Sequence, residues 1–175
     1  MPANVSIRRA EPRDLERVAE IKVRNWADTY GSLIEPAALA QFLELDKQVE
    51  ELRGAMHDAE TLLLVAESTS GEVMGFALTY IDQRPDPWLE SLHVLHGFRS
   101  HGAGTMLMRQ TAAELIARGH RTLRLGVVSG NQAAEQFYVR LGATHIGREP
   151  ASWAPGVWHE LYRWADIAGL TIRPR

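Results

Sequence analysis

The sequence contains no cysteine. Disulfide bonds, thiolate metal sites and a cysteine nucleophile are therefore excluded, so any reaction must rely on other side chains. No stretch approaches the roughly eighteen consecutive apolar residues that a membrane-spanning helix needs. The first residues, Met1 to Asn4, have no apolar signal region. These absences predict a soluble, cytoplasmic protein without a membrane partner.

The chain also lacks an excess of either charge. It has 19 basic and 22 acidic residues, a formal net charge of -3 and no basic block. Nucleic acid is therefore not expected as a partner. At 175 residues, with 45% apolar and 23% charged residues, the composition is that of an ordinary globular protein. It predicts a single domain spanning residues 1–175, long enough to bury a core.

Apolar runs and alternating patterns predict a mixed α/β chain with helices on both sides of a twisted sheet. The expected strands cover residues 5–8, 62–67, 73–81, 88–95, 123–128, 143–148 and 157–164. The expected helices cover residues 12–30, 36–56 with some interruption, 105–118 and 131–142. We see no linker, repeat or low-complexity segment between them.

The most informative stretch runs from Glu90 to Arg118 and has the order strand, glycine-bearing turn, helix. Gly102 and Gly104 have no Cβ, so a ligand can approach their backbone closely. The first amides of the following helix have no intrahelical partner, and the helix dipole adds positive charge there. Such a turn is suited to hold a pyrophosphate, with Arg99 close enough to assist.

Two common phosphate motifs do not fit this turn. The chain has no Gly-x-x-x-x-Gly-Lys-Ser/Thr string, and Leu107 stands where a dinucleotide fingerprint requires its third glycine. What remains is Arg99-x-x-Gly102-x-Gly104 after the strand residues Leu92-His93-Val94. This string resembles the coenzyme A signature of the GNAT N-acetyltransferase superfamily, Gln/Arg-x-x-Gly-x-Gly/Ala. By itself, it leaves open a turn that binds nothing.

A second string strengthens the resemblance. Asn131-x-x-Ala134-x-x-Phe137-Tyr138-x-x-Leu141-Gly142 is similar to the second GNAT signature, Asn-x-x-Ala-x-x-Phe-Tyr-x-x-Leu-Gly-Phe. The departure is Ala143, where the family usually has phenylalanine. Asn131 and Tyr138 are two helical turns apart and therefore point the same way. The resemblance implies the GNAT fold, a mixed sheet of about seven strands that splay at the middle, flanked by about four helices.

The resemblance also implies acetyl-coenzyme A as co-substrate, bound in the gap between the splayed strands. The backbone of Leu92, His93 and Val94 would pair with the pantetheine arm, and the Val94 amide would face the thioester carbonyl. Asn131 would contact the cofactor, and Tyr138 would lie beside the sulfur. The residues implied to hold the pyrophosphate are Arg99, Ser100, His101, Gly102, Ala103, Gly104 and Thr105.

Acetyl transfer to an amine requires a base for the amine, a donor for the oxyanion and a proton for the thiolate. Tyr138 suits the last role, because its phenol carries a proton. For the base we expect Glu90, through a water, because strand alternation places it on the face of Leu92 and Val94. His93 is a second candidate, although alternation turns it away from Glu90. Gly126 stands where some family members have a glutamate base.

The chain shows no metal site, because His93 and His96 face opposite sides of a strand and lack further clustered ligands. His57, His101, His120 and His145 read as ordinary surface or loop residues. The acceptor amine is expected at the end of the first helix and the last strands, where the family usually binds it. Its expected contacts are Trp26, Tyr30, Trp153 and His159, with Asp28, Trp158 and Glu160 as further candidates. Rings with carboxylates would favour a cationic amine.

We therefore predict an N-acetyltransferase that moves an acetyl group from acetyl-coenzyme A to a primary amine by direct attack in a ternary complex. A small-molecule acceptor is expected, and family members are often homodimers. Three alternatives stay open: a non-catalytic coenzyme A sensor, a protein N-terminal or lysine acetyltransferase, and transfer of a longer acyl group. An open acceptor groove would favour protein substrates, whereas a closed aromatic pocket would favour small molecules.

Overall fold

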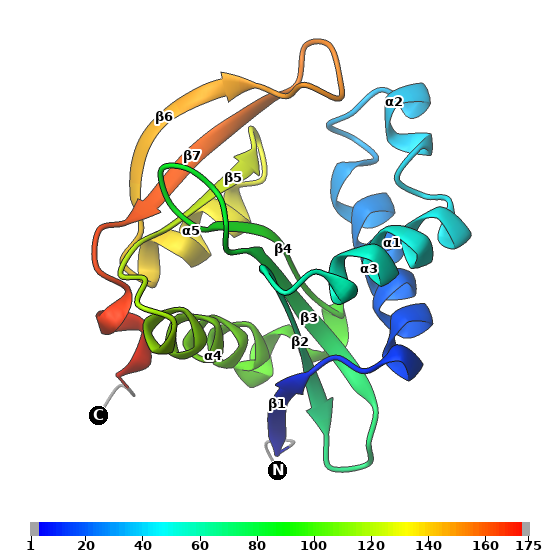
Figure 1. Ribbon diagram of the computed structural model, residues 1–175. Coiled ribbons are helices and arrows are strands. Elements are labelled where there is room, and N and C mark those ends of the chain that lie inside the picture. Colours follow the sequence, from blue (N-terminus) through cyan, green and yellow to red (C-terminus); the bar gives the residue numbers. More distant parts are fainter. Residues whose placement is uncertain (1–3, 173–175) are drawn as a thin grey trace.

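One sheet of seven strands organises the molecule, and the computed structural model describes residues 4–172. The strands lie in the order β1-β2-β3-β4-β5-β7-β6 (Figure 1). Every neighbouring pair is antiparallel except β4 and β5, which are parallel. Their bounds are β1 Val5–Arg9, β2 Thr61–Ser68, β3 Val73–Tyr80, β4 Trp88–Val94, β5 Leu123–Val128, β6 Thr144–Pro150 and β7 Trp158–Trp164.

Helices cover both faces of this sheet. α1 (Leu15–Tyr30) and α3 (Leu45–His57) pack on one face, which we call the α1 face. α4 (Ala103–Ala117) packs on the other, the α4 face, and α5 (Gln132–Arg140) lies on the same side near β5 and β7 (Figure 1). Trp164 of β7 anchors α5, because its Nε1 donates to the Leu141 carbonyl at 3.0 Å.

The segment predicted as one helix over residues 36–56 forms two. α2 (Pro36–Ala40) ends in a turn over residues 41–44, and α3 starts at Leu45. The amides of Phe42 and Leu43 each bond to a carbonyl three residues earlier, at 2.9 and 3.1 Å, so the α-helical ladder stops there. α2 packs against the loop between β6 and β7, because Leu39 shares a buried cluster with Ala151 and Ala154.

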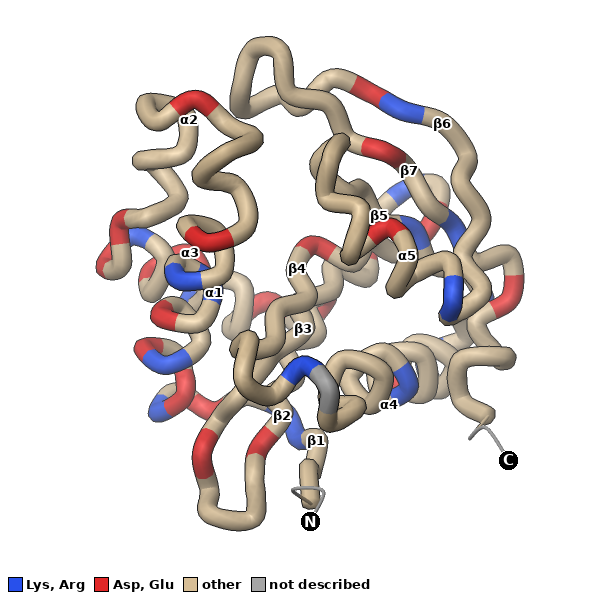
Figure 2. The backbone as a smooth tube through the Cα atoms, turned by 180° about the vertical axis from the view of Figure 1, so that it is seen from behind, with Lys and Arg blue, Asp and Glu red and all other residues tan. Residues whose placement is uncertain are grey.

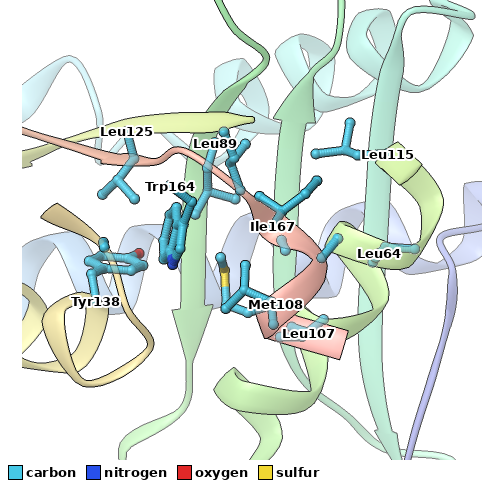
Figure 3. Packing of buried hydrophobic residues seen from close by; sticks show 14 of the residues in the cluster. Leu64, Leu89, Leu107, Met108, Leu115, Leu125, Tyr138, Trp164 and Ile167 are labelled. Atoms are coloured by element: carbon cyan, nitrogen blue, oxygen red, sulfur yellow. The ribbon is translucent and has the colours of Figure 1, made fainter. Parts of the chain in front are cut away.

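The strand β2 explains why both faces must be covered. Its run from Leu62 to Ala66 is apolar at every position, so the side chains on both faces of the strand must be buried. Leu62 and Leu64 enter the core under α4, whereas Leu63 and Val65 enter the core under α1 and α3. Figure 3 shows the α4-side core, which also contains Trp164, and Ile167 of the C-terminal 3-10 segment Ile167–Thr171.

The remaining 3-10 segments, Pro12–Asp14 and His96–His101, lead into α1 and α4. Charged residues of both signs occur on α1, α3, β6 and β7 (Figure 2). Among the residues that the structure describes, no helix is long and apolar enough to cross a membrane.

Candidate active site

The site begins where β4 and β5 separate. The two strands pair at only two positions, Trp88 with Arg124 and Leu89 with Leu125, and then diverge. β5 instead continues its pairing with β7 along its full length, as far as Val128 opposite His159. Between the diverging strands lies a cavity of about 460 Å³. The resemblance predicted this splayed gap, whereas the strand patterns alone did not.

A buried carboxylate closes the narrow end of the gap. Asp86, 4% exposed, precedes β4 and accepts from Thr122 Oγ1 at 2.5 Å and from Arg163 Nε at 2.9 Å. Arg124 of β5 lies 3.7 Å away. Because these partners come from the start of β5 and from β7, Asp86 joins three neighbouring strands at their meeting point. The Arg163 hydrogen bond holds the pKa of Asp86 below its ordinary value.

The backbone of β4 opens toward the gap. Leu95 donates to the Met74 carbonyl at 2.9 Å, so its backbone faces the β3 side. In an antiparallel ladder the backbone direction alternates, and the polar groups of Leu92 and Val94 therefore point away from β3. The hydrogen bonds of the Val94 carbonyl support this direction, because the carbonyl accepts from Asn25 Nδ2 and Arg99 Nε, which are not on β3, each at 3.1 Å. The backbone N–H and C=O of Leu92 and the Val94 amide can therefore bind an extended ligand. The backbone N–H and C=O of His93 point toward β3 instead.

The glycine turn leads into α4 as predicted, and the helix starts earlier than expected, at Ala103. Gly102 has φ +77°, a left-handed conformation that favours glycine. Met106 makes the first intrahelical bond, to the Gly102 carbonyl at 3.0 Å. The amides of Ala103, Gly104 and Thr105 therefore have no intrahelical acceptor and are available to an anion.

Gly104 serves a second purpose, because it lets α4 approach α5. A Cβ at Gly104 would lie 3.3 Å from Phe137 Cζ. Of the seven predicted pyrophosphate residues, four line the cavity, and His101 and the buried Ala103 do not, so those two would act through their backbone alone. The four are Arg99, Gly102, Gly104 and Thr105. The side chain of Ser100 lies outside the part of the chain that the structure describes.

The second motif forms the opposite wall. Asn131 caps α5, because its Oδ1 accepts from the Ala134 amide at 3.3 Å. Tyr138 follows two turns later, lines the same cavity and is 7% exposed. Its ring packs edge-on to Trp164, with centroids 6.0 Å apart (Figure 3). Burial raises the pKa of Tyr138, and the neighbouring Tyr30 adds to the rise, so the phenol keeps its proton at neutral pH.

The prediction that Glu90 shares a face with Leu92 and Val94 was wrong. A β-bulge shifts the register, so that Leu78 pairs with Ser91 while Thr79 pairs with Leu89. Glu90 is the extra residue, and beyond it the alternation is inverted. Glu90 lies on the α1 face, where Lys22 of α1 and Glu51 of α3 influence its charge. It still lines the cavity, and Trp88 Nε1 donates to its Oε2 at 2.8 Å.

The bulge also corrects the prediction for His93, which was expected to face away from Glu90. Both residues lie on the α1 face, and Lys22 influences the pKa of each. His93 packs against Phe76 with ring centroids 5.4 Å apart. Burial lowers the pKa of His93 to about 3, with Lys22 and Arg99 acting in the same direction. Burial also raises the pKa of Glu90, which makes Glu90 the better base near neutral pH.

Gly126 gives no room for the glutamate that some family members carry there. A Cβ at this position would lie 3.2 Å from Trp88 Cη2 and 3.3 Å from His159 Cβ. Trp88 therefore occupies the space above Gly126 while its indole nitrogen binds Glu90. Trp88 was not predicted as a site residue, although its position two residues before Glu90 on the same strand was a usable signal.

The expected acceptor residues Trp26, Tyr30, Trp153 and His159 all line the cavity. Trp26 stacks on Phe42 at 4.4 Å, and both approach Trp153, at 5.6 and 4.9 Å between ring centroids. We call Trp26, Phe42 and Trp153 the aromatic bridge, because they join α1 and the turn after α2 to the β6–β7 loop. Gln41 reinforces it by donating to the Trp153 carbonyl at 3.4 Å.

The further acceptor candidates do not reach this cavity. Asp28 is exposed, and Trp158 is 38% exposed and covered by Arg148, 4.4 Å from its ring centroid. Glu160 instead accepts from Ser129 at 2.7 Å and lies 2.8 Å from His145. Among the described residues, no cluster of three or more metal-ligating side chains occurs. The structure adds Lys22, Asn25 and Phe42 to the cavity wall.

Comparisons with known proteins agree with this geometry. Residues 16–143 match the family described as "Acetyltransferase (GNAT) family". A thialysine N-epsilon-acetyltransferase of Mus musculus is 28% identical over 147 residues, covering 74% of this chain and 85% of its own. An uncharacterized N-acetyltransferase of Mycobacterium tuberculosis is 25% identical over 129 residues, covering 74% and 82%.

Solved structures share the fold. The PaiA N-acetyltransferase from Thermoplasma acidophilum, in complex with coenzyme A, has a TM-score of 0.74 at 18% identity and covers 91% of this chain and 98% of its own. Since the family match spans most of the chain, the protein belongs to the GNAT acetyltransferase family. It is accordingly an acyltransferase.

Proposed function

We propose that the protein transfers an acetyl group from acetyl-coenzyme A to the primary amine of a small molecule, by direct attack in a ternary complex. The observation that carries this proposal is the gap between β4 and β5. The backbone groups of Leu92, the Val94 amide, the α4 amides, Glu90 and Tyr138 all meet in or beside one cavity. Related structures contain coenzyme A or acetyl-coenzyme A, which supports the choice of donor.

The donor would bind in two places. The pyrophosphate would accept hydrogen bonds from the amides of Gly104 and Thr105, with the Arg99 guanidinium nearby. The pantetheine arm would extend β4 as an added strand on Leu92 and Val94. The Val94 amide would then donate to the thioester oxygen and stabilise the charge that develops there. Asn25 and Arg99 fix this amide by holding the Val94 carbonyl.

The reaction requires three proton transfers. Glu90, through a water, would accept the proton of the ammonium, which otherwise has no lone pair for attack. As the C–N bond forms and the C–S bond breaks, Tyr138 would give its proton to the departing sulfur, and the second proton that the nitrogen must lose would pass to the Tyr138 phenolate. The raised pKa of each residue supports these roles, because Glu90 becomes a stronger base and Tyr138 stays protonated.

The aromatic bridge supports a small acceptor. It ties together two segments on opposite sides of the cavity, Trp26 and Phe42 on one side and Trp153 on the other. An open groove for a protein chain would require these rings to be apart. One relative is named for thialysine and another, from Streptomyces lavendulae, for streptothricin, both of which are small molecules.

We also propose that the chain acts in the cytoplasm as one domain over residues 1–175, without a nucleic-acid partner. The absence of cysteine and of a basic block supports this. A homodimer stays a prediction, for which β6 at the sheet edge, with Ile146 48% exposed, offers a surface. Light scattering would decide the oligomeric state.

The test is thiol release from acetyl-coenzyme A across a panel of primary amines, with a control that lacks an amine. Amine-dependent release together with the acetylated amine in a mass spectrum is the expected result. Saturable acetyl-coenzyme A binding without turnover of any amine, peptide N-terminus or lysine would instead identify a sensor. A preference for propionyl-coenzyme A or a longer acyl donor would show that the transferred group is longer than acetyl.

A further inference from the structure

Lys22 is a charged residue of the cavity that the proposed reaction does not use. The chain has only two lysines, Lys22 and Lys47. Lys22 lies on α1, one turn before Trp26, and lines the cavity together with Glu90. Lys47, in contrast, is exposed on α3. A lysine on the partly buried side of a helix requires a reason, because desolvation disfavours its charged form.

Glu90 does not neutralise Lys22 directly. Among the residues that the structure describes, neither Lys22 nor Glu90 has an ion-pair partner within the 4.0 Å limit for a salt bridge. The groups that act on Lys22 are Glu90 and the exposed Glu51, which oppose the lowering of its pKa by burial. The carboxylate of Glu90 receives one hydrogen bond, from Trp88. The cavity therefore presents one cation and one anion, and both are available to a ligand.

The remaining walls at this end are apolar or neutral. The aromatic bridge contributes Trp26, Phe42 and Trp153, and Trp88 adds a further ring. Burial lowers the pKa of His159, so this residue is neutral at neutral pH. The other cavity cations, Arg99 and Arg140, come from the glycine turn and from α5, on the side proposed for the cofactor. Lys22 and Glu90 are thus the charged groups on the acceptor side.

We infer that the acceptor is an amino acid with a large apolar or aromatic side chain. This inference rests on the proposed function. The amine would lie beside Glu90, the carboxylate would pair with the Lys22 ammonium, and the side chain would pack against the aromatic bridge. One positive and one negative group on the ligand match the two charges of the cavity. After the ammonium has given one proton to Glu90, the amine nitrogen attacks the thioester carbon. The C–S bond breaks, the thiolate takes the Tyr138 proton, and the second nitrogen proton passes to the Tyr138 phenolate.

The experiment compares amino acids with the amines that result from their decarboxylation. We would measure initial rates of thiol release for phenylalanine against phenethylamine, tryptophan against tryptamine, and methionine against 3-methylthiopropylamine. The expected result is a kcat/KM at least about tenfold higher for the amino acid of a pair, as one desolvated charge pair provides. Equal or faster turnover of the decarboxylated amines would overturn the inference and leave the proposed function intact.

Two variants separate a direct contact from an indirect effect. Lys22→Met removes the charge at similar length and should raise KM for the amino acids about tenfold while leaving KM for the decarboxylated amines unchanged. Lys22→Arg should recover part of the loss, and Lys47→Met is the matched control without effect. If Lys22→Met changed KM equally for the amino acid and the amine of each pair, Lys22 would act only indirectly, through its effect on Glu90. That result would contradict the inference. Absence of turnover with every amine of the wider panel would instead count against the proposed function.

Discussion

At the scale of single residues, the geometry of Glu90 decides how the site works. Residue types and spacing predicted Tyr138, Asn131 and the glycine turn, because short local strings specify them. The face of Glu90 could not be predicted, because the bulge between Leu78 and Thr79 depends on the pairing of β4 with β3. Lys22 was missed for the same reason, since Glu51 and Glu90, the residues that act on it, come from other elements.

The first prediction concerns the role of Glu90 as base. Glu90→Gln should lower kcat/KM by about 10²-fold or more, because the ammonium loses its proton acceptor. In the wild type, activity should fall as pH drops through the pKa of Glu90, which burial places above its ordinary value of 4.5. A pH–rate profile for both proteins checks this. An acidic limb that persists unchanged in the variant would assign the base elsewhere.

The second prediction concerns Tyr138. Tyr138→Phe removes the phenolic proton and keeps the ring against Trp164, so the fold should be preserved. Turnover should fall by about 10²-fold, whereas the dissociation constant of acetyl-coenzyme A should change little. Single-turnover kinetics combined with calorimetry would measure both quantities. Equal turnover of variant and wild type would remove Tyr138 as the acid.

At the scale of elements, sequence patterns predicted every strand of the sheet to within a few residues. Long apolar runs such as Leu62 to Ala66 determine their own structure, because they must be buried on both sides. The division of residues 36–56 into α2 and α3 was less visible. It follows from Phe42, whose contacts with Trp26 and Trp153 involve segments distant in sequence. The turn before α4 was predicted because glycines specify turns locally, whereas the helix itself starts two residues earlier than predicted, at Ala103.

The third prediction tests the α4 amides. Gly104→Glu is a poor probe, because a side chain there would strike Phe137. Thr105, the third residue of α4, also lines the cavity, and a glutamate at that helix position is favourable for folding. Thr105→Glu should therefore weaken acetyl-coenzyme A binding about tenfold or more, through repulsion of the pyrophosphate, while the melting temperature is kept.

Thr105→Gln serves as the uncharged control with the same shape. Affinity measured by calorimetry should follow the charge of the side chain rather than its size. If Thr105→Glu binds acetyl-coenzyme A as tightly as Thr105→Gln does, the pyrophosphate lies elsewhere.

At the scale of the whole molecule, the sheet must be held together at one end of the gap and kept apart at the other. Asp86 supplies the closed end through Thr122 just before β5, Arg124 of β5 and Arg163 of β7. The aromatic bridge lies on the acceptor side. The splay itself was predicted only by resemblance, because no local pattern says that two parallel strands will separate after Leu89.

The fourth prediction concerns the stability that Asp86 contributes. Asp86→Asn leaves Arg163 without its buried partner and should lower the free energy of unfolding by about 2–4 kcal/mol at neutral pH. Since the pKa of Asp86 is lower in the folded state, its contribution is complete above the ordinary value of 3.8 and is lost as pH falls through the folded pKa. Urea unfolding of both proteins should therefore show a difference that narrows in acid. A constant difference across pH would contradict the ionic role.

The most direct test of the account is a calorimetric titration of the wild-type protein with acetyl-coenzyme A, and with free coenzyme A beside it. The gap between β4 and β5, the α4 amides and Arg99 together predict saturable binding with one site per chain. If a protein shown to be folded by circular dichroism bound neither compound, the gap would not be a coenzyme A site, and the proposed acetyl transfer would be wrong.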